Sequence, residues 1–152
     1  MKRKKLDITS LDRRLKILQL GKHNHLLTQL ANIESNTYNH FKKWTPLKLC
    51  GLSYFAGGYV HILENLKNKQ FSGDLKIIYI DLFSGCGINQ INHVLIAGSP
   101  LVCIDSVTNS NVKFDKMFFN DAKSEYSTAL VKRLEFLSEK DAFAWIKNKY
   151  YI

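Results

Sequence analysis

The stretch Lys76-Ile-Ile-Tyr-Ile-Asp-Leu-Phe-Ser-Gly-Cys-Gly87 decides the fold that the sequence predicts. Residues 77–82 form a near-continuous apolar run, which predicts a central parallel strand buried on both faces. Asp81 interrupts the run near its end, where a buried carboxylate needs donors from the backbone or from a ligand. Gly85 and Gly87 allow a sharp turn at the strand's carboxyl end, where open parallel sheets bind ligands. The stretch therefore predicts a ligand-binding turn or, as the alternative, a tight strand-to-helix turn around a satisfied Asp81.

The glycine pattern narrows the classes of ligand. It has the form Asp-x-Phe-x-Gly-x-Gly and lacks the third glycine of a dinucleotide fingerprint, which disfavours nicotinamide and flavin cofactors. The sequence also lacks Gly-Lys-Ser/Thr, so a phosphate-loop hydrolase is disfavoured. A small nucleotide-binding fold unrelated to methyl transfer remains a third, weaker hypothesis.

The composition is typical of one globular domain. The chain has 152 residues, of which 45% are hydrophobic, and it contains no long uncharged apolar run that predicts a membrane span. The cationic start is followed by Leu6 and Asp7 instead of an apolar segment, which excludes a secretory signal. Cys50, Cys86 and Cys103 are widely spaced, so neither a disulfide framework nor a zinc site is indicated, and we expect a reducing cytoplasm.

The net charge of +9 leaves two interpretations open. Lys and Arg side chains neutralise phosphates, so nucleic acid is a candidate partner for the basic N-terminus. Alternatively, the excess charge belongs to a basic arm at residues 1–9 and to solvated helix faces.

Helical patterns dominate the residues before the central strand. Ser10 can cap a helix whose apolar residues continue to Leu30, with a break near Gly21. His23, His25 and His40 could be considered metal ligands, but two histidines two residues apart do not share a helix face, so we expect no metal.

The next segments are predicted from their boundary residues. Residues 32–43 read as a loop or a short helix, and Thr45-Pro46 starts a helix that continues to Leu66. The Gly57-Gly58 pair within this helix predicts a close contact with a neighbouring element. Residues 68–74 form a polar turn that leads into the central strand.

After the glycine turn, the sequence predicts alternating loops, helices and strands. Residues 88–97 read as an irregular loop, and Gly98-Ser99-Pro100 starts a helix. Residues 116–121 predict a second strand that ends in an acidic residue. Residues 122–138 predict a helix with Arg133 among its outward-facing side chains. One or two helical turns at 141–147 and a third strand at 149–152 complete the prediction.

This arrangement resembles the first part of class I methyltransferases, which bind S-adenosylmethionine (SAM) on a doubly wound sheet. The closer resemblance is to the three-Cys-motif partner protein (TcmP) family. The matching residues are Trp44-Thr45 with Lys48 and the helix 49–66, Tyr79-Ile-Asp-Leu-Phe-Ser-Gly-Cys-Gly87, Ala97-Gly-Ser-Pro-Leu-Val102, and Phe118-Phe-Asn-Asp121 before the helix around Leu130–Leu134.

The resemblance implies a set of cofactor-binding residues. The turn from Phe83 through Ser84, Gly85 and Cys86 to Gly87 would lie against the methionine part of SAM. Asp81 would orient this turn or meet the ligand's amino group, and Asp121 would accept hydrogen bonds from the ribose hydroxyls.

Two alternatives and one departure from the family pattern remain at these positions. Asp105 lies 20 residues after Gly85, the spacing usual for the ribose acid, if residues 101–105 form the second strand. Ser99-Pro100 favours a helix there and therefore favours Asp121. Asn120 departs from the family pattern, which more often has an acidic residue nearby. Cys86 is a candidate nucleophile, but a small residue between glycines is the favoured interpretation.

The expected fold is α/β, with N-terminal helices followed by the first part of a Rossmann-like class I methyltransferase parallel sheet. Residues 1–43 would form a basic arm and helical region, and residues 44–152 a partial methyltransferase-like domain. Because the predicted sheet stops at about its third strand, we expect a truncated or split protein, encoded by a mobile element or phage, whose enzymatic activity is left open. A three-Cys-motif protein or a second methyltransferase half is the expected partner, and a non-catalytic adaptor is the alternative function.

Overall fold

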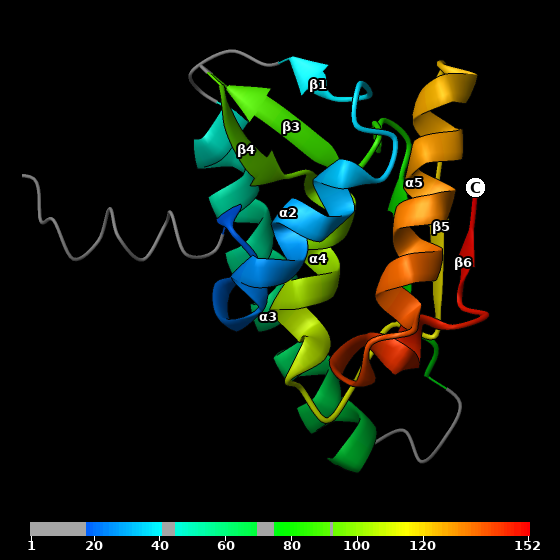
Figure 1. Ribbon diagram of the computed structural model, residues 1–152. Coiled ribbons are helices and arrows are strands. Elements are labelled where there is room, and N and C mark those ends of the chain that lie inside the picture. Colours follow the sequence, from blue (N-terminus) through cyan, green and yellow to red (C-terminus); the bar gives the residue numbers. More distant parts are fainter. Residues whose placement is uncertain (1–17, 41–44, 70–74, 92) are drawn as a thin grey trace, which may run out of the picture.

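The computed structural model describes residues 18–40, 45–69, 75–91 and 93–152 as a mixed α/β protein (Figure 1). This confirms the α/β class. The elements, in chain order, are η1 (Gly21–His23), α2 (Asn24–Asn32), β1 (Asn39–His40), α3 (Thr45–Lys69), β2 (Ile78–Asp81), β3 (Ile88–Ile91), β4 (Val94–Ala97), α4 (Ser99–Thr108), β5 (Lys116–Phe119), α5 (Ser124–Ser138), η2 (Asp141–Ile146) and β6 (Tyr150–Tyr151). The predicted basic arm, the helix start at Ser10 and residues 70–74 of the polar turn predicted at 68–74 lie outside the described residues. Residues 68 and 69 of that predicted turn belong to α3.

Three parallel strands form one sheet in the order β2-β5-β6. Ile80 lies beside Phe118, and Phe118 lies beside Tyr151, so the strands are aligned side by side. The predictions of a second strand at β5 and a third strand at β6 are therefore confirmed. Both new strands are short, and each follows a helix along the chain.

Helices cover one face of this sheet. In Figure 1, α5 runs alongside β5, and Met117 and Phe119 are buried in one core with Leu130 and Leu134. On the opposite face, Ile78 and Ile80 of β2 are 51% and 61% exposed.

The prediction of a central strand buried on both faces is therefore wrong: among the described strands, β2 lies at the edge of its sheet, paired with β5 alone, and one of its faces is exposed. Strand side chains point to alternate faces, and the helices of the described residues pack on one of them.

A second small sheet has the order β1-β3-β4. β1 pairs in parallel with β3, and β3 forms an antiparallel hairpin with β4 in which Ile88 faces Ala97. The prediction of an irregular loop at residues 88–97 is wrong, and β1 was missed within the predicted loop or short helix. Asn39 and Asn89 are buried polar residues that interrupt the apolar pattern of these strands. Their burial is tolerated because the Asn39 amide donates a hydrogen bond to the Asn89 side-chain oxygen.

The helix starts agree with the boundary signals. α3 begins at Thr45, before Pro46, and α4 begins at Ser99 with Pro100 in its first turn. α3 packs along α4, and a Cβ atom on Gly57 would lie 3.6 Å from the Ser106 carbonyl oxygen of α4, whereas one on Gly58 would meet open space. The expected close contact therefore applies to Gly57 alone.

The N-terminal helices close the other side of the core. α2 packs against β4 and α5, with its four apolar residues Leu26, Leu27, Leu30 and Ala31 buried. The expected break occurs at Leu20 and Gly21, whose φ angles are 62° and 52°. No helix in the described part of the chain has the length and apolar character needed to cross a bilayer.

Candidate functional site

The carboxylate of Asp81 joins the end of β2 to the start of α4. Its Oδ2 accepts a hydrogen bond from the Ser99 hydroxyl at 2.6 Å and one from the Tyr79 hydroxyl at 3.3 Å, while Oδ1 accepts one from the Phe83 backbone N–H at 3.1 Å. Burial raises the pKa of Tyr79, so its hydroxyl stays protonated and can donate. The hydrogen-bond donors that a carboxylate at this position needs therefore come from the protein itself. Through the Phe83 N–H, Asp81 orients the turn.

The glycines of the turn are in conformations that other residues avoid. Gly85 has φ 59° and Gly87 has φ 81°, both in the left-handed region. A Cβ atom on Gly85 would stand 2.0 Å from the Asn39 side-chain nitrogen.

Gly98 completes this packing. Its N–H donates to the Gly87 carbonyl oxygen at 2.7 Å, and a Cβ atom on Gly98 would stand 2.9 Å from the Gly87 carbonyl carbon. The turn and the start of α4 therefore touch backbone to backbone.

Asp121 reaches the same turn from the end of β5. Its Oδ2 accepts a hydrogen bond from the Gly85 N–H at 2.9 Å, and its Oδ1 accepts one from the Lys123 N–H at 3.0 Å. Ser84 donates its backbone N–H to the Asn120 carbonyl oxygen at 2.9 Å. The structure thus brings two predicted signals together, the glycine turn and the acid after the second strand. A carboxylate accepts about four hydrogen bonds, so further donors can still bind Asp121.

Asp105, the rival ribose acid, faces another part of the molecule. It lies on α4, and its Oδ1 is 3.0 Å from His23 Nδ1. Burial raises the pKa of Asp105. The alternative in which residues 101–105 form a strand is therefore wrong, because these residues are helical.

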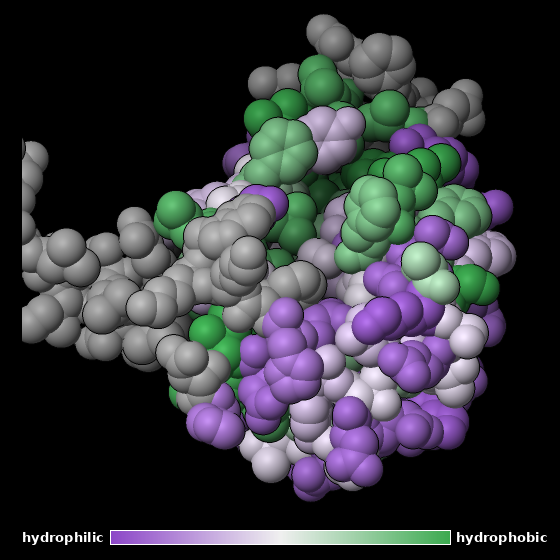
Figure 2. All heavy atoms as spheres, turned by 90° about the horizontal axis from the view of Figure 1, so that it is seen from above, coloured by the Kyte–Doolittle hydropathy of each residue, from purple (hydrophilic) through white to green (hydrophobic). Residues whose placement is uncertain are grey.

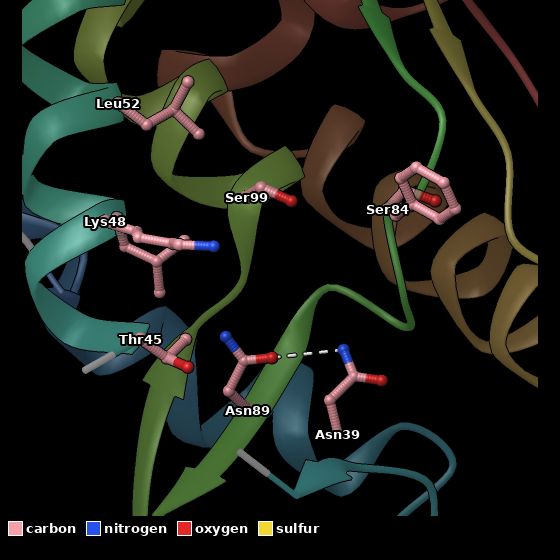
Figure 3. A pocket seen from close by; sticks show the side chains of 9 residues that line it. Asn39, Thr45, Lys48, Leu52, Ser84, Asn89 and Ser99 are labelled. Carbon is pink, nitrogen blue, oxygen red and sulfur yellow. Dashed lines mark hydrogen bonds between the residues drawn. The ribbon is translucent and has the colours of Figure 1, made fainter. Parts of the chain in front are cut away.

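A pocket of about 340 Å³ opens beside the turn (Figure 3). Figure 3 shows Lys48 extending from α3 toward the space that Ser84 and Ser99 border on the other side. The lining residues come from β1, α3, the turn, β3 and α4; they are Asn39, Thr45, Lys48, Leu49, Leu52, Phe83, Ser84, Asn89 and Ser99. The pocket therefore combines an apolar wall with hydroxyl, carboxamide and ammonium groups.

Two of the predicted site residues line this pocket, namely Phe83 and Ser84. Phe83 is 87% exposed at its rim. The other five predicted residues, Asp81, Gly85, Cys86, Gly87 and Asp121, are not among the lining residues and support the turn. The prediction missed Asn39, Lys48 and Asn89 as site residues. Asn39 lies in a segment predicted to be a loop or a short helix and Asn89 in one predicted to be an irregular loop, so no sequence pattern identified them. Lys48 was named only among the residues that carry the family resemblance.

The buried side chain of Arg133 links the glycine turn to the segment after α2 by hydrogen bonds. Its guanidinium donates to the carbonyl oxygens of Cys86 at 2.7 Å, Leu30 at 3.0 Å, Ile33 at 2.8 Å and Thr37 at 2.9 Å. Arg133 is fully buried, so the prediction that it faces outward is wrong. Arg133 follows Leu130 by three residues, which places both on one helix face, and this spacing could have identified it.

The cysteines near the site are enclosed. The Cys86 sulfur lies 3.3 Å from the Thr37 carbonyl oxygen and 3.2 Å from that of Ile88, in a fully buried position. Burial raises the pKa of the Cys103 thiol to about 12. This geometry favours Cys86 as a small packing residue over a nucleophile. In the described ranges, no three His, Cys, Asp or Glu side chains gather as a ligand set for a metal ion.

The fold and the pocket define an α/β protein with a small-molecule-sized cleft at the carboxyl end of a parallel strand. The chain gave no match to a family model, to a curated protein or to a solved structure.

Proposed function

We propose that the chain is a methyltransferase-like protein of the three-Cys-motif partner type that binds S-adenosylmethionine in the pocket beside the glycine turn. One observation carries the proposal: the pocket of about 340 Å³ lies at the carboxyl end of β2, with Phe83 and Ser84 on its wall. This volume lies in the range of about 300–1,000 Å³ of small-molecule sites. Its position is the one that open parallel sheets use for ligands.

The order of the parallel strands supports a Rossmann-like arrangement. The sheet runs β2-β5-β6, so each new strand is added on the same side of the first. The first three strands of a doubly wound sheet have this order. The glycine turn follows the first strand and the acid Asp121 follows the second, as the resemblance implies.

The residues present fit an adenosyl amino acid. Phe83 and the Leu52 side chain offer apolar contacts, and Asn39 and Asn89 offer carboxamides. Lys48 would place a cation near the carboxylate of the methionine part. Asp121 does not line the pocket, so it would reach the ribose hydroxyls with its remaining lone pairs only if the ligand extends past Ser84 to the Gly85 side of the turn. The ligand, when bound, would supply a transferable methyl group.

The proposal stops at cofactor binding. Among the residues that line the pocket, Lys48 is the one ionisable side chain, so the described part of the chain offers no carboxylate or histidine base there. We propose that the methyl acceptor is handled with a partner, either a three-Cys-motif protein or a second methyltransferase half, in the cytoplasm.

Isothermal titration with SAM and S-adenosylhomocysteine tests the proposal. Leu52→Trp fills the pocket from α3, and Phe55→Trp adds the same side chain at a position that is 70% exposed and does not line the pocket. We expect the chain and the Phe55→Trp variant to bind alike and Leu52→Trp to lose about tenfold or more in affinity. Folded protein that gives no heat at millimolar ligand would reject cofactor binding.

A second candidate function is a non-catalytic adaptor that engages protein or nucleic acid through its basic helical region. α3 favours it, because Tyr54, Phe55, Tyr59 and Ile62 are exposed apolar residues on one helix, and Phe55 stacks on Tyr59 with ring centroids 5.9 Å apart. Affinity for RNA or DNA fragments that falls steeply with salt, in a chain that binds no SAM, would favour the adaptor.

A further inference from the structure

The face of the β2-β5-β6 sheet opposite the helices carries a continuous apolar row. Ile80, Phe118 and Tyr151 lie side by side across the three strands and are 61%, 37% and 46% exposed. The rings of Phe118 and Tyr151 stack with centroids 4.9 Å apart, and Ile78 extends the row along β2. We call these four residues the bare face.

Cations border the bare face at one end. Lys116 lies beside Ile78 in the register, and its ammonium stands 5.6 Å from the centre of the Tyr151 ring. Lys76, two residues before Ile78, is exposed as well. The carboxylate of β2, Asp81, turns to the other side, toward Ser99. Within the described residues of the three strands, the bare face therefore combines apolar side chains and cations without a carboxylate.

The space-filling view shows an uneven distribution of hydrophobic residues. In Figure 2 they gather in the upper part of the surface, around a hollow, while hydrophilic residues dominate the lower part. Parallel sheets in α/β proteins are normally covered on both faces, and helices are the usual cover. The exposed apolar row of the bare face, which its register and exposed fractions define, is a candidate interaction site.

The charge of the chain indicates which kind of helix can cover the bare face. The chain carries a net charge of +9, so a second copy would bring like charges together, and the first 17 residues of the chain are themselves rich in Lys and Arg. We propose that the bare face docks an acidic amphipathic helix of another polypeptide, with apolar side chains on Ile78, Ile80, Phe118 and Tyr151 and carboxylates near Lys76 and Lys116. This inference does not depend on the pocket or on its ligand.

A synthetic helical peptide tests the proposal. The probe carries Leu at i, i+3, i+4 and i+7 and Glu at its other positions, with a fluorescent label, and a matched peptide has Lys in place of Glu. Fluorescence anisotropy with the full chain should give affinity about tenfold or more higher for the acidic peptide, and the difference should shrink with salt. The double variant Ile80→Glu/Phe118→Glu should lose the binding, whereas Phe55→Glu, an equal change on α3, should keep it.

Two further measurements keep the test decisive. Lys116→Glu changes one exposed side chain and should weaken the acidic peptide while strengthening the basic one, even if the double variant fails to fold. Equal affinity for both peptides would overturn the proposal, as would equal losses in the double variant and in Phe55→Glu. A dimer of the unmodified chain in sedimentation velocity that Phe118→Glu abolishes would assign the face to a second copy instead. The affinity for S-adenosylhomocysteine, measured with and without the peptide, should be the same, because the bare face and the pocket are separate sites. Failure of one proposal can therefore be distinguished from failure of the other.

Discussion

The carboxylate of Asp121 accepts a hydrogen bond from the backbone N–H of Gly85 at 2.9 Å, across 36 residues of sequence. This contact ties the end of β5 to the turn after β2. It makes Asp121 part of the turn's architecture in addition to its proposed role toward a ribose.

Replacing Asp121 with Asn should weaken this contact. Gly85 and Lys123 donate to different oxygens of Asp121, and Asn replaces one of these oxygens with an NH2 group that cannot accept, so one of the two N–H groups loses its acceptor. We expect a loss of about 1–2 kcal/mol in the free energy of unfolding, measured by urea denaturation. A variant with unchanged stability would show that the contact is dispensable in solution.

Gly85→Ala should destabilise the chain by about 2 kcal/mol or more, because the position has positive φ and the new Cβ meets Asn39. The control is Gly58→Ala within α3, where a Cβ meets open space. We expect that variant to gain about 0.5–1 kcal/mol from helix propensity. Thermal unfolding followed by circular dichroism compares the two, and the same sign for both would contradict the prediction.

Arg133→Met should cost about 3 kcal/mol or more, since it leaves several buried carbonyl oxygens without donors. Lys132→Met is the matched control on the neighbouring residue. Lys132 pairs with Glu34 at the surface, where ion pairs contribute little. Chemical denaturation of both variants measures the difference, and comparable losses would refute the structural role of Arg133.

The unfolding free energy should depend on pH through Asp105. Burial raises the pKa of this carboxyl in the folded state, so its contribution to stability is complete below the ordinary carboxyl pKa of about 4 and is lost as pH rises through the raised value. Asp105→Asn should therefore gain stability relative to the parent as pH increases from about 4 to 7. Urea unfolding of the parent and of Asp105→Asn at several pH values tests this, and a stability difference that does not change with pH would contradict it.

The three cysteines should be unreactive in the folded chain. All are buried, and burial raises the pKa of Cys103 to about 12. We expect Ellman's reagent to label them slowly under native conditions and fully in denaturant. Rapid native labelling of one thiol, traced by mass spectrometry to Cys86, would revive the interpretation of Cys86 as a nucleophile.

Local backbone signals in the sequence predicted the framework of the site. Gly85, Gly87 and Pro100 require particular backbone conformations, so the turn and the start of α4 could be located without knowledge of their neighbours. The strand β5 followed from its own apolar run.

The remaining features depend on distant partners. Asn39 lies in β1 and Asn89 in β3, and their side-chain amides bond to each other across 50 residues of sequence. Because both are polar, these strands do not show the apolar alternation by which a strand is recognised in a sequence. Arg133 is buried because carbonyl oxygens from residues 30–37 surround it, and its charge alone predicts exposure. The exposure of Ile78 and Ile80 depends on where the helices pack, which the strand's own residues do not determine.

The contact of Arg133 with the Leu30 and Cys86 carbonyls has a consequence for biosynthesis. The residues concerned are 103 and 47 positions apart, so the support of the glycine turn cannot assemble while the ribosome is still adding α5. The Leu30 and Cys86 carbonyl oxygens therefore lack their guanidinium donor until about residue 133 has left the exit tunnel.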